Sequence, residues 1–412
     1  MPTRVDAARD RMPRWVSPLL DRRRLVSAGV VALAGLSALF VVHAPFRIGV
    51  LSDLSSRDAV DDSRGTLLAA TMALEDFGGR VLGRSTQILA GDTQGDPAVA
   101  TDVATAWLDH KQTAVLLDSG GASVGLALRD LASQRAQVVL SVGSPADPMP
   151  CGPTIFQFTP SAAALAEAGL TSALAAGVDR WWLIAGSGEA GAALQRQATR
   201  VIEDHGAKVV GAIDRRFGSV DADVVERARD ARATGLVFAS VGADLVDAIR
   251  QARALGLTQG RALVGMQVDI GDVAALGQAA AGLQFASAFY PAMTDNALLW
   301  SRRFVARHGA TPPGSRQAMA YTATLHYLAG VRAAGLDSTE RIVSWMRAQP
   351  VRDVLFRNAP VRADGRVLID LQLLRVREET GSGPLDQVER FGIVKAEDLY
   401  AASAEAPCLS RL

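Results

Sequence analysis

Apolar and polar positions follow a regular order between residues 47 and about 142. A short apolar strand is followed three times by a small-residue loop and then by a helix with one apolar face. The three units are RIGVLSD before LLAATMALEDFGG, STQILAGD before PAVATDVATAWLDH, and TAVLLDSGGASVG before LALRDLASQ. This order predicts a parallel sheet with helices on both faces. Ligands of such sheets bind at the carboxyl ends of the strands, so the loops there are the candidate binding elements.

The same pattern restarts at Pro160 with a second series of helices and strands. Its predicted strands are RWWLIAG, KVVGAID, LVFAS and RALVGMQVD. Two long helices follow, roughly 296–308 and 316–334, and the tail reads as short antiparallel strands with a hairpin turn at 363–365. We therefore predict an α/β protein with two similar lobes that follow one another along the chain.

Length and charge support this division and exclude one class of partner. A chain of 412 residues is long for a single core. Its net charge is zero, but the first 44 residues carry seven Arg and three Asp, which leaves a mildly acidic body. A body without a basic stripe argues against a nucleic-acid partner.

Residues 1–44 have the layout of an export signal. Three arginines, Arg22 to Arg24, precede the 18 uncharged residues 25–42, and small residues follow. The run RRRLV also resembles a twin-arginine signal. Pro45 should hinder cleavage, and 18 apolar residues can just span a bilayer. The segment is therefore a cleaved signal peptide or a retained signal anchor, and the body lies in the periplasm or, anchored by residues 25–42, on the outer face of the cytoplasmic membrane.

The two cysteines are Cys151 and Cys408. In an oxidising compartment they can form one disulfide between the C-terminus and the middle of the chain. Two free thiols are the alternative.

Several segments together resemble one known family. They are RIGVLSD, MALEDFGG with GDTQGDPAVA, CGPTIFQFTPSAAALA, AIRQARALGL, AMAYTATLHYLAGVRAAG and PVRADGRVLIDLQLLRV. In order and spacing they look like segments of the solute-binding proteins of ABC transporters, in the type I, leucine/isoleucine/valine-binding-like branch. The resemblance covers nearly everything after residue 45.

The resemblance implies two Rossmann-like lobes with parallel sheets, joined by three crossovers. Lobe one would comprise 46–158 and 289–346, and lobe two 159–288 and 347–412. A small solute with a carboxylate (an amino acid, an amide or a small organic acid) would be held between them and stabilise their closure. The implied partner is an ABC permease in the membrane; we expect a monomer without a cofactor. A membrane-tethered ligand sensor of the same fold is the alternative.

The candidate ligand contacts of lobe one lie in three loops. Gly121, Ala122 and Ser123 begin a helix, where free backbone N–H groups and the helix dipole favour a carboxylate; Ser123 could instead cap that helix. The family uses the next loop for hydroxyl and backbone contacts to an amino-acid ligand. The remaining candidates are small or hydroxylic residues of that loop and of the first loop, namely Ser52, Ser55, Ser141, Gly143 and Ser144.

Lobe two departs from the family pattern. Ser187 and Gly188 stand where relatives commonly have Asp-Tyr, so an aromatic wall is missing. Ser240 is a small polar residue that can face the cleft, and Tyr290 lies on a crossover where an aromatic often contacts the ligand. Asp269 is our candidate partner for a ligand ammonium, with Asp272 beside it. Branched-chain amino-acid specificity therefore cannot be transferred to this chain.

A dinucleotide enzyme is a further alternative. Residues 186–191 match G-x-G-x-x-G after a predicted strand, and Asp214 ends the next strand. Export and the lack of a nearby proton-transfer set oppose this interpretation. The five histidines are scattered, and no nucleophile or metal motif is present, so we expect no enzyme activity.

Overall fold

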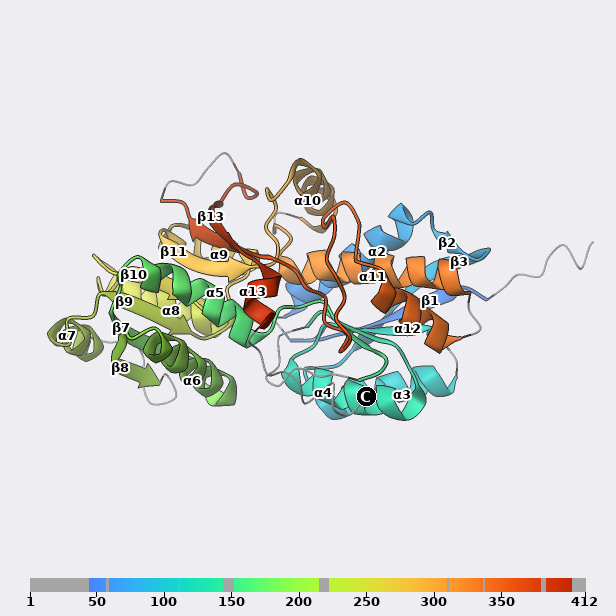
Figure 1. The fold of residues 1–412 in the computed structure, drawn as a ribbon, viewed down its shortest axis with the longest axis horizontal. Coiled ribbons are helices and arrows are strands. Elements are labelled where there is room, and N and C mark those ends of the chain that lie inside the picture. Colours follow the sequence, from blue (N-terminus) through green and yellow to red (C-terminus); the bar gives the residue numbers. More distant parts are fainter. Residues whose placement is uncertain are drawn as a thin grey trace, which may run out of the picture. The chain divides into compact units, whose positions relative to one another are not determined.

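The computed structural model describes residues 44–56, 59–110, 112–143, 152–214, 222–309, 311–335, 338–378 and 383–401. All but Ala44 belong to one compact unit, Pro45–Leu412. Its strands form two sheets, and each sheet is the centre of one lobe (Figure 1). The predicted α/β class with two Rossmann-like lobes is confirmed.

Residues 1–43 of the export segment and both cysteines lie outside these residues. Among the helices that the structure describes, none combines the length and the apolar character needed to cross a membrane.

The first lobe is built on a six-stranded sheet in the order β2-β3-β1-β4-β5-β6. Its strands pair in parallel except for the short β2, which runs antiparallel to β3. The strands are β1 (Phe46–Ser52), β2 (Arg80–Val81), β3 (Arg84–Asp92), β4 (Val115–Asp118), β5 (Val139–Ser141) and β6 (Ile155–Gln157). The helices between them are α2 (Val60–Asp76), α3 (Pro97–Asp109) and α4 (Ala122–Arg135).

The second lobe is built on a seven-stranded sheet in the order β13-β12-β11-β10-β9-β7-β8. It is parallel except for β12, which is antiparallel to both of its neighbours. The strands are β7 (Arg180–Ala185), β8 (Lys208–Asp214), β9 (Gly235–Ala239), β10 (Ala262–Gly265), β11 (Leu283–Ser287), β12 (Leu371–Val376) and β13 (Val388–Val394). The helices are α5 (Ala162–Ala175), α6 (Gly188–Asp204), α7 (Ala222–Asp230), α8 (Gly242–Ala254), α9 (Ile270–Leu276) with the 3₁₀ turn Gly277–Ala280, and α13 (Ala396–Ala401).

The central strands of the sheets, such as β7 and β9, are buried on both faces because they are almost wholly apolar. In β7, Trp181 and Leu183 enter the core under α5 and α6, whereas Trp182 and Ile184 enter the core under α7 and α8. This division follows from the two-residue period of a strand. Helices α3 and α4 cover one face of the first sheet and α2 and α11 the other (Figure 1).

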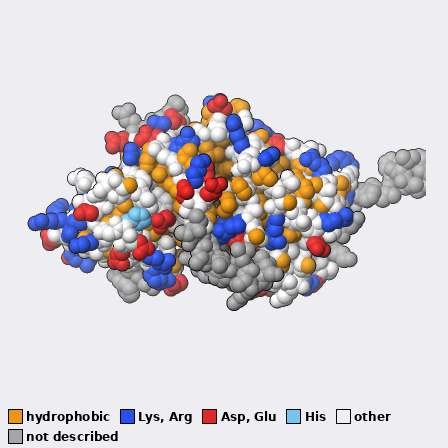
Figure 2. Space-filling view, viewed as in Figure 1, with side chains coloured by type: hydrophobic (Ala, Val, Ile, Leu, Met, Phe, Trp, Pro, Cys, Tyr) orange, Lys and Arg blue, Asp and Glu red, His pale blue; other side chains and the backbone are white. Residues whose placement is uncertain are grey.

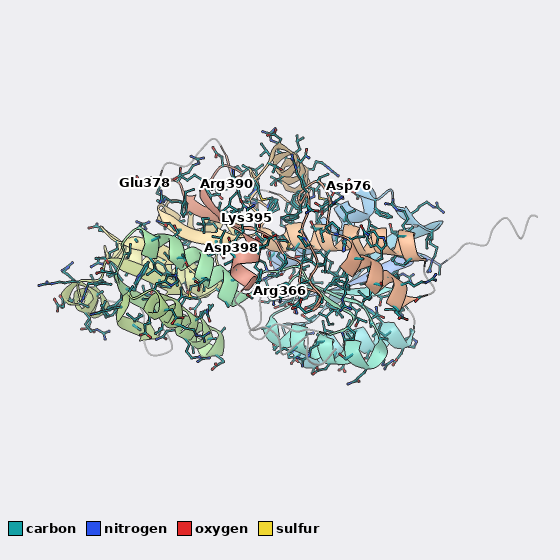
Figure 3. All side chains as sticks on the ribbon, in the orientation of Figure 1. Asp76, Arg366, Glu378, Arg390, Lys395 and Asp398 are labelled. Atoms are coloured by element: carbon teal, nitrogen blue, oxygen red, sulfur yellow. The ribbon has the colours of Figure 1, made fainter. Side chains whose placement is uncertain are left out.

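The chain passes between the lobes three times, as expected. It crosses after β6, returns after β11 to the first lobe, and crosses again before β12. The middle passage forms α10 (Asp295–His308), α11 (Ser315–Ala334) and α12 (Thr339–Ala348). Asp76, labelled in Figure 3, joins α2 to two of these helices, because it accepts hydrogen bonds from Arg303 at 2.8 Å and from the Tyr321 hydroxyl at 2.8 Å.

The predicted hairpin turn is also confirmed. Gly365 N–H donates to Arg362 O at 2.9 Å, and Val361 and Val367 face each other antiparallel. The hairpin covers β6, since Gln157 N–H donates to Gly365 O and accepts at its own carbonyl from Val367 N–H, both at 2.9 Å. Gly365 has φ +88°, and a Cβ there would lie 2.0 Å from Ile155 O. Only glycine meets both conditions.

Several helices begin earlier than the sequence pattern predicted. The helix predicted from LLAATMALEDFGG begins at Val60, so that Asp61 and Asp62 lie in its first turn. Acidic residues are favourable at this end of a helix because they complement its dipole. The earlier start brings both carboxylates to the carboxyl edge of the sheet.

Charges of both signs are interspersed over the described face in Figure 2. A continuous basic stripe is not visible on that face, in agreement with the mildly acidic composition of the body.

Candidate functional site

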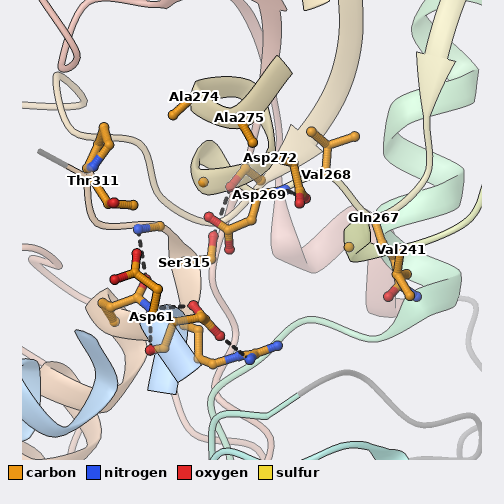
Figure 4. Close-up of a pocket in the computed structure, with 18 of the residues that line it drawn as sticks. Asp61, Val241, Gln267, Val268, Asp269, Asp272, Ala274, Ala275, Thr311 and Ser315 are labelled. Carbon is orange, nitrogen blue, oxygen red and sulfur yellow. Dashed lines mark hydrogen bonds and ion pairs between the residues drawn. The ribbon is translucent and has the colours of Figure 1, made fainter. Parts of the chain in front are cut away.

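A cavity of about 900 Å³ lies where the two lobes meet. The first lobe contributes the start of α2, the end of β5, the end of α10 and the start of α11. The second lobe contributes α8, the loop after β10 and α9, part of which is shown in Figure 4. The volume is within the range of about 300 to 1,000 Å³ that suits a small molecule.

Carboxylates outnumber guanidinium groups in the lining of this cavity. The acids are Asp61, Asp62, Asp247, Asp269 and Asp272; the cations are Arg250 and Arg316, and His308 also lines the wall. A site of this composition favours a positively charged group in the solute over a negative charge alone.

Arg316, near the start of α11, is the cation at the centre of this acidic set. Its Nη1 is ion-paired with the Asp62 carboxylate, and Gln317 Nε2 donates to Asp62 O at 3.1 Å. The charge of Asp62, followed by weaker contributions from Asp269, Asp272 and Asp118, raises the pKa of Arg316 above its ordinary value. Arg316 therefore stays charged and offsets part of the acidity of the cavity.

Asp269 and Asp272 form a capping box at the start of α9. Asp269 Oδ1 accepts from Ile270 N–H at 2.6 Å, and Asp272 Oδ2 accepts from Asp269 N–H at 2.9 Å. Burial, followed by the charge of the nearby Asp62, raises the pKa of Asp269 to about 6. Burial also raises the pKa of Asp272 to about 7, with smaller contributions from Asp269 and Asp62. Both groups therefore change charge near neutral pH.

Asp272→Asn is expected to stabilise the protein at pH 8. A carboxyl group whose pKa is higher in the folded state binds protons more tightly there, so stability falls as pH rises from about 4 to about 7. An amide has no such penalty. We expect a gain of about 1 kcal/mol at pH 8 and no gain near pH 4. The gain at pH 8 is smaller than the raised pKa alone would give, because water in the cavity screens the charge.

Urea unfolding at both pH values measures this gain. Asp247→Asn is the control, because Asp247 is an exposed carboxylate of the same cavity. An equal gain in both variants, or a gain that does not change with pH, would refute the conclusion that burial raises the pKa of Asp272.

The predicted residues of the first lobe gather at one sheet edge. Ser52 is fully buried with its Oγ 2.6 Å from Ser119 Oγ, and Ser141 Oγ donates to Asp118 Oδ2 at 3.3 Å. Asp118 Oδ1 accepts from Gly120 N–H at 2.9 Å, and burial raises the pKa of Asp118 to about 6. These hydroxyls are thus bonded to protein groups.

Other predicted residues of this lobe differ in position. Gly143 lines the cavity, and a Cβ there would lie 2.1 Å from Gly120 O, so the two loops touch through glycine. Gly121 is the N-cap of α4, which excludes the capping role for Ser123. The remaining three are placed as follows: Ala122 begins α4, Ser55 is exposed, and Ser144 lies outside the described residues.

Of the residues predicted in the second lobe, Asp269 and Asp272 line the cavity. Ser187 and Gly188 are exposed at the start of α6. Ser240 is buried beside Gly186, where a Cβ would lie 2.8 Å from that of Ser240. Tyr290 is buried in the core of the lobe.

The G-x-G-x-x-G match has a packing explanation. A Cβ on Gly191 would lie 2.0 Å from Gly186 O, so glycine permits α6 to approach the strand end. Ser187 N–H and Oγ donate to Asp244 Oδ2 at 2.7 and 3.1 Å. A pyrophosphate at this turn would therefore meet a carboxylate, which opposes dinucleotide binding.

Sequence reasoning missed Asp62 and Arg316. They come from helices far apart in the chain and meet only in the fold. The pair Asp61-Asp62 ahead of an apolar helix was an available signal for a helix start. For Arg316 no local signal exists.

The two-lobed architecture with a cavity between the lobes agrees with a comparison of the sequence with known protein families. A family model described as periplasmic binding protein matches residues 45–382. The chain belongs to this family. No curated protein matches it significantly. Periplasmic binding proteins are solute-binding proteins rather than enzymes, and membership implies a small-molecule ligand, a membrane permease partner and a location outside the cytoplasm.

Solved structures of this family resemble the chain over most of its length. A periplasmic binding protein from Burkholderia mallei is 26% identical with a TM-score of 0.79, covering 88% of this chain and 98% of its own. A branched chain amino acid ABC transporter periplasmic ligand-binding protein from Burkholderia xenovorans is 25% identical with a TM-score of 0.78, covering 86% and 96%. A solute-binding protein from R. palustris, solved with benzoate, shares the fold at 18% identity and a TM-score of 0.72, covering 85% and 96%.

Proposed function

We propose that this chain is the extracytoplasmic solute-binding component of an ABC importer and captures a small carboxylate-bearing solute by hinge closure. The observation that carries the proposal is one cavity of about 900 Å³ lined from both lobes. Closure around a solute in such a cavity stabilises one arrangement of the lobes, which a permease can recognise. The proposed hinge lies at the three crossovers, between lobe one (46–158 and 289–346) and lobe two (159–288 and 347–412). Within residues 347–412, the hairpin at 361–367 packs on β6 of lobe one.

The solute class rests on the relatives and on the cleft together. Similar structures are described as binding branched-chain amino acids or benzoate. Both kinds of ligand carry a carboxylate. Arg316 in the cavity favours such an anion, and the five aspartates of the lining favour a solute that also carries an ammonium group. Amino acids, amides and small organic acids are therefore the first solutes to test.

A thermal-shift screen of the purified protein tests the proposal. The panel contains branched-chain and other amino acids, benzoate and hydroxybenzoates, aliphatic carboxylates, amides and NAD. A solute at about 100 times its dissociation constant should add roughly 2.7 kcal/mol of stability. A carboxylate-bearing solute that shifts the transition supports the proposal. A shift with NAD alone, or no shift with any carboxylate, would overturn it.

A further inference from the structure

The N-terminus of α11 is held by groups from both lobes. From the first lobe, Asp62 is ion-paired with Arg316, and Gln317 Oε1 accepts from Gly314 N–H at 2.9 Å. From the second lobe, Ser287 Oγ lies 2.8 Å from Ser315 Oγ. Because Ser287 Oγ already donates to Phe289 O at 2.8 Å, Ser315 is the donor between the two hydroxyls.

Asp269 makes the second contact from the second lobe. Its carboxylate accepts a hydrogen bond from the Ser315 backbone N–H, one of the groups that a helix leaves unpaired at its start. Figure 4 shows Asp269 close to Ser315. The same carboxylate accepts from Ile270 N–H in its own lobe. Asp269 thus lies at the start of two helices at once, and its negative charge complements both dipoles.

Gly314 leaves the space for this contact. A Cβ at Gly314 would lie 1.5 Å from Asp269 Oδ1 and 2.4 Å from its Cγ. The backbone of Gly314, with φ −103°, is one that any residue adopts. The glycine is therefore required by the approach of Asp269 and not by the conformation of the chain.

We propose that Asp269 is a clasp between the lobes: its carboxylate docks against Gly314 and Ser315 and biases the chain toward the closed arrangement, with or without solute. Asp269 is thus a positioning residue rather than a solute contact. The inference rests on the proposed function in one respect, since it takes closure of the lobes as the step that captures the solute. It makes the affinity for solute depend on a contact that the solute does not touch.

Two single variants test the clasp from its two sides. Gly314→Ala places a methyl group where the carboxylate lies, and the obstructing atoms belong to a side chain that can swing away without unfolding α11. Asp269→Ser keeps a good N-cap for α9 but is too short to reach α11. Gly271→Ala is the matched control, since a Cβ at Gly271 meets nothing within 4 Å.

Small-angle X-ray scattering of the purified protein without added solute is the measurement. We expect a larger radius of gyration in both single variants than in the wild type and in Gly271→Ala. The double variant should equal the single ones, because both changes remove the same contact. For a solute found in the screen, a closed population reduced to about a tenth would weaken apparent binding about tenfold.

An unchanged radius in Asp269→Ser and in Gly314→Ala would overturn the clasp. Circular dichroism shows whether each variant is folded, and Asp269→Ser decides the question if Gly314→Ala does not fold. The scattering needs no solute, so its failure is separate from a failure of the solute screen. A protein that binds solute but shows no change in radius would keep the proposed function and lose the clasp.

Discussion

Trp300→Ala is expected to lower the free energy of unfolding by about 3 to 5 kcal/mol, the usual range for removing a large buried aromatic side chain. Trp300 of α10 is 2% exposed. Its ring centroid lies 5.7 Å from those of Phe289 and Phe304 and 5.3 Å from that of Tyr321. Phe289 belongs to the second crossover and Tyr321 to α11, so the indole fills the junction of three segments.

Urea unfolding at neutral pH measures this loss. Trp300→Phe is the control, because it retains an aromatic ring, leaves a smaller cavity and should therefore cost clearly less than Trp300→Ala. A loss below about 1 kcal/mol in Trp300→Ala would mean that α10 and α11 close the space left by the indole.

Arg316→Gln is expected to lower the free energy of unfolding by about 2 kcal/mol at pH 8. The loss is smaller than the about 3 to 5 kcal/mol for a fully buried ion pair, because the side chains of Arg316 and Asp62 are 27% and 36% exposed. The variant leaves Asp62, Asp269 and Asp272 without their common counter-ion. Their mutual repulsion is then uncompensated.

The loss should shrink as the pH falls toward 5. Asp269 and Asp272 have pKa values of about 6 and about 7 with Arg316 in place, and removal of a cation raises both. Below these values the two groups are neutral and need no counter-ion. Urea unfolding of the variant and the wild type at pH 5 and pH 8 checks the trend.

Arg250→Gln is the matched control for Arg316→Gln. Arg250 lines the same cavity, and its Nη2 donates to Ala275 O at 2.6 Å at an exposed position. We expect a smaller loss that does not depend on pH. A pH-independent loss in Arg316→Gln as well would mean that Arg316 stabilises the fold by packing and not by charge.

Much of the fold was predictable because burial on both faces leaves a strong local signal. Strands such as β9 are apolar at every position, and the turn at 363–365 needs a glycine that the sequence displays. The start of α2 was predicted late, since residues 60–65 carry no regular apolar period although they form its first turns. The spacing of apolar residues alone therefore does not locate the end of a helix.

The candidate site was less predictable for a different reason. The loops of small residues do lie at the expected sheet edges, and Gly143 and Asp269 do line the cavity. Ser52 and Ser141, however, are bonded to Ser119 and Asp118, and hydrogen-bond partners across neighbouring strands are not visible in a sequence. The ion pair between Asp62 and Arg316 likewise exists only after the middle passage has packed on α2.

The hairpin that covers β6 also constrains the order in which the protein can be completed. The edge of β6 exposes unpaired backbone groups until the chain beyond Gly365 is available to bond with Gln157. Contacts between segments so far apart in the chain are slow to form during folding. The first lobe therefore cannot mature as an independent amino-terminal unit during synthesis, and a chain cut short before this hairpin would be left with an open strand edge prone to aggregation.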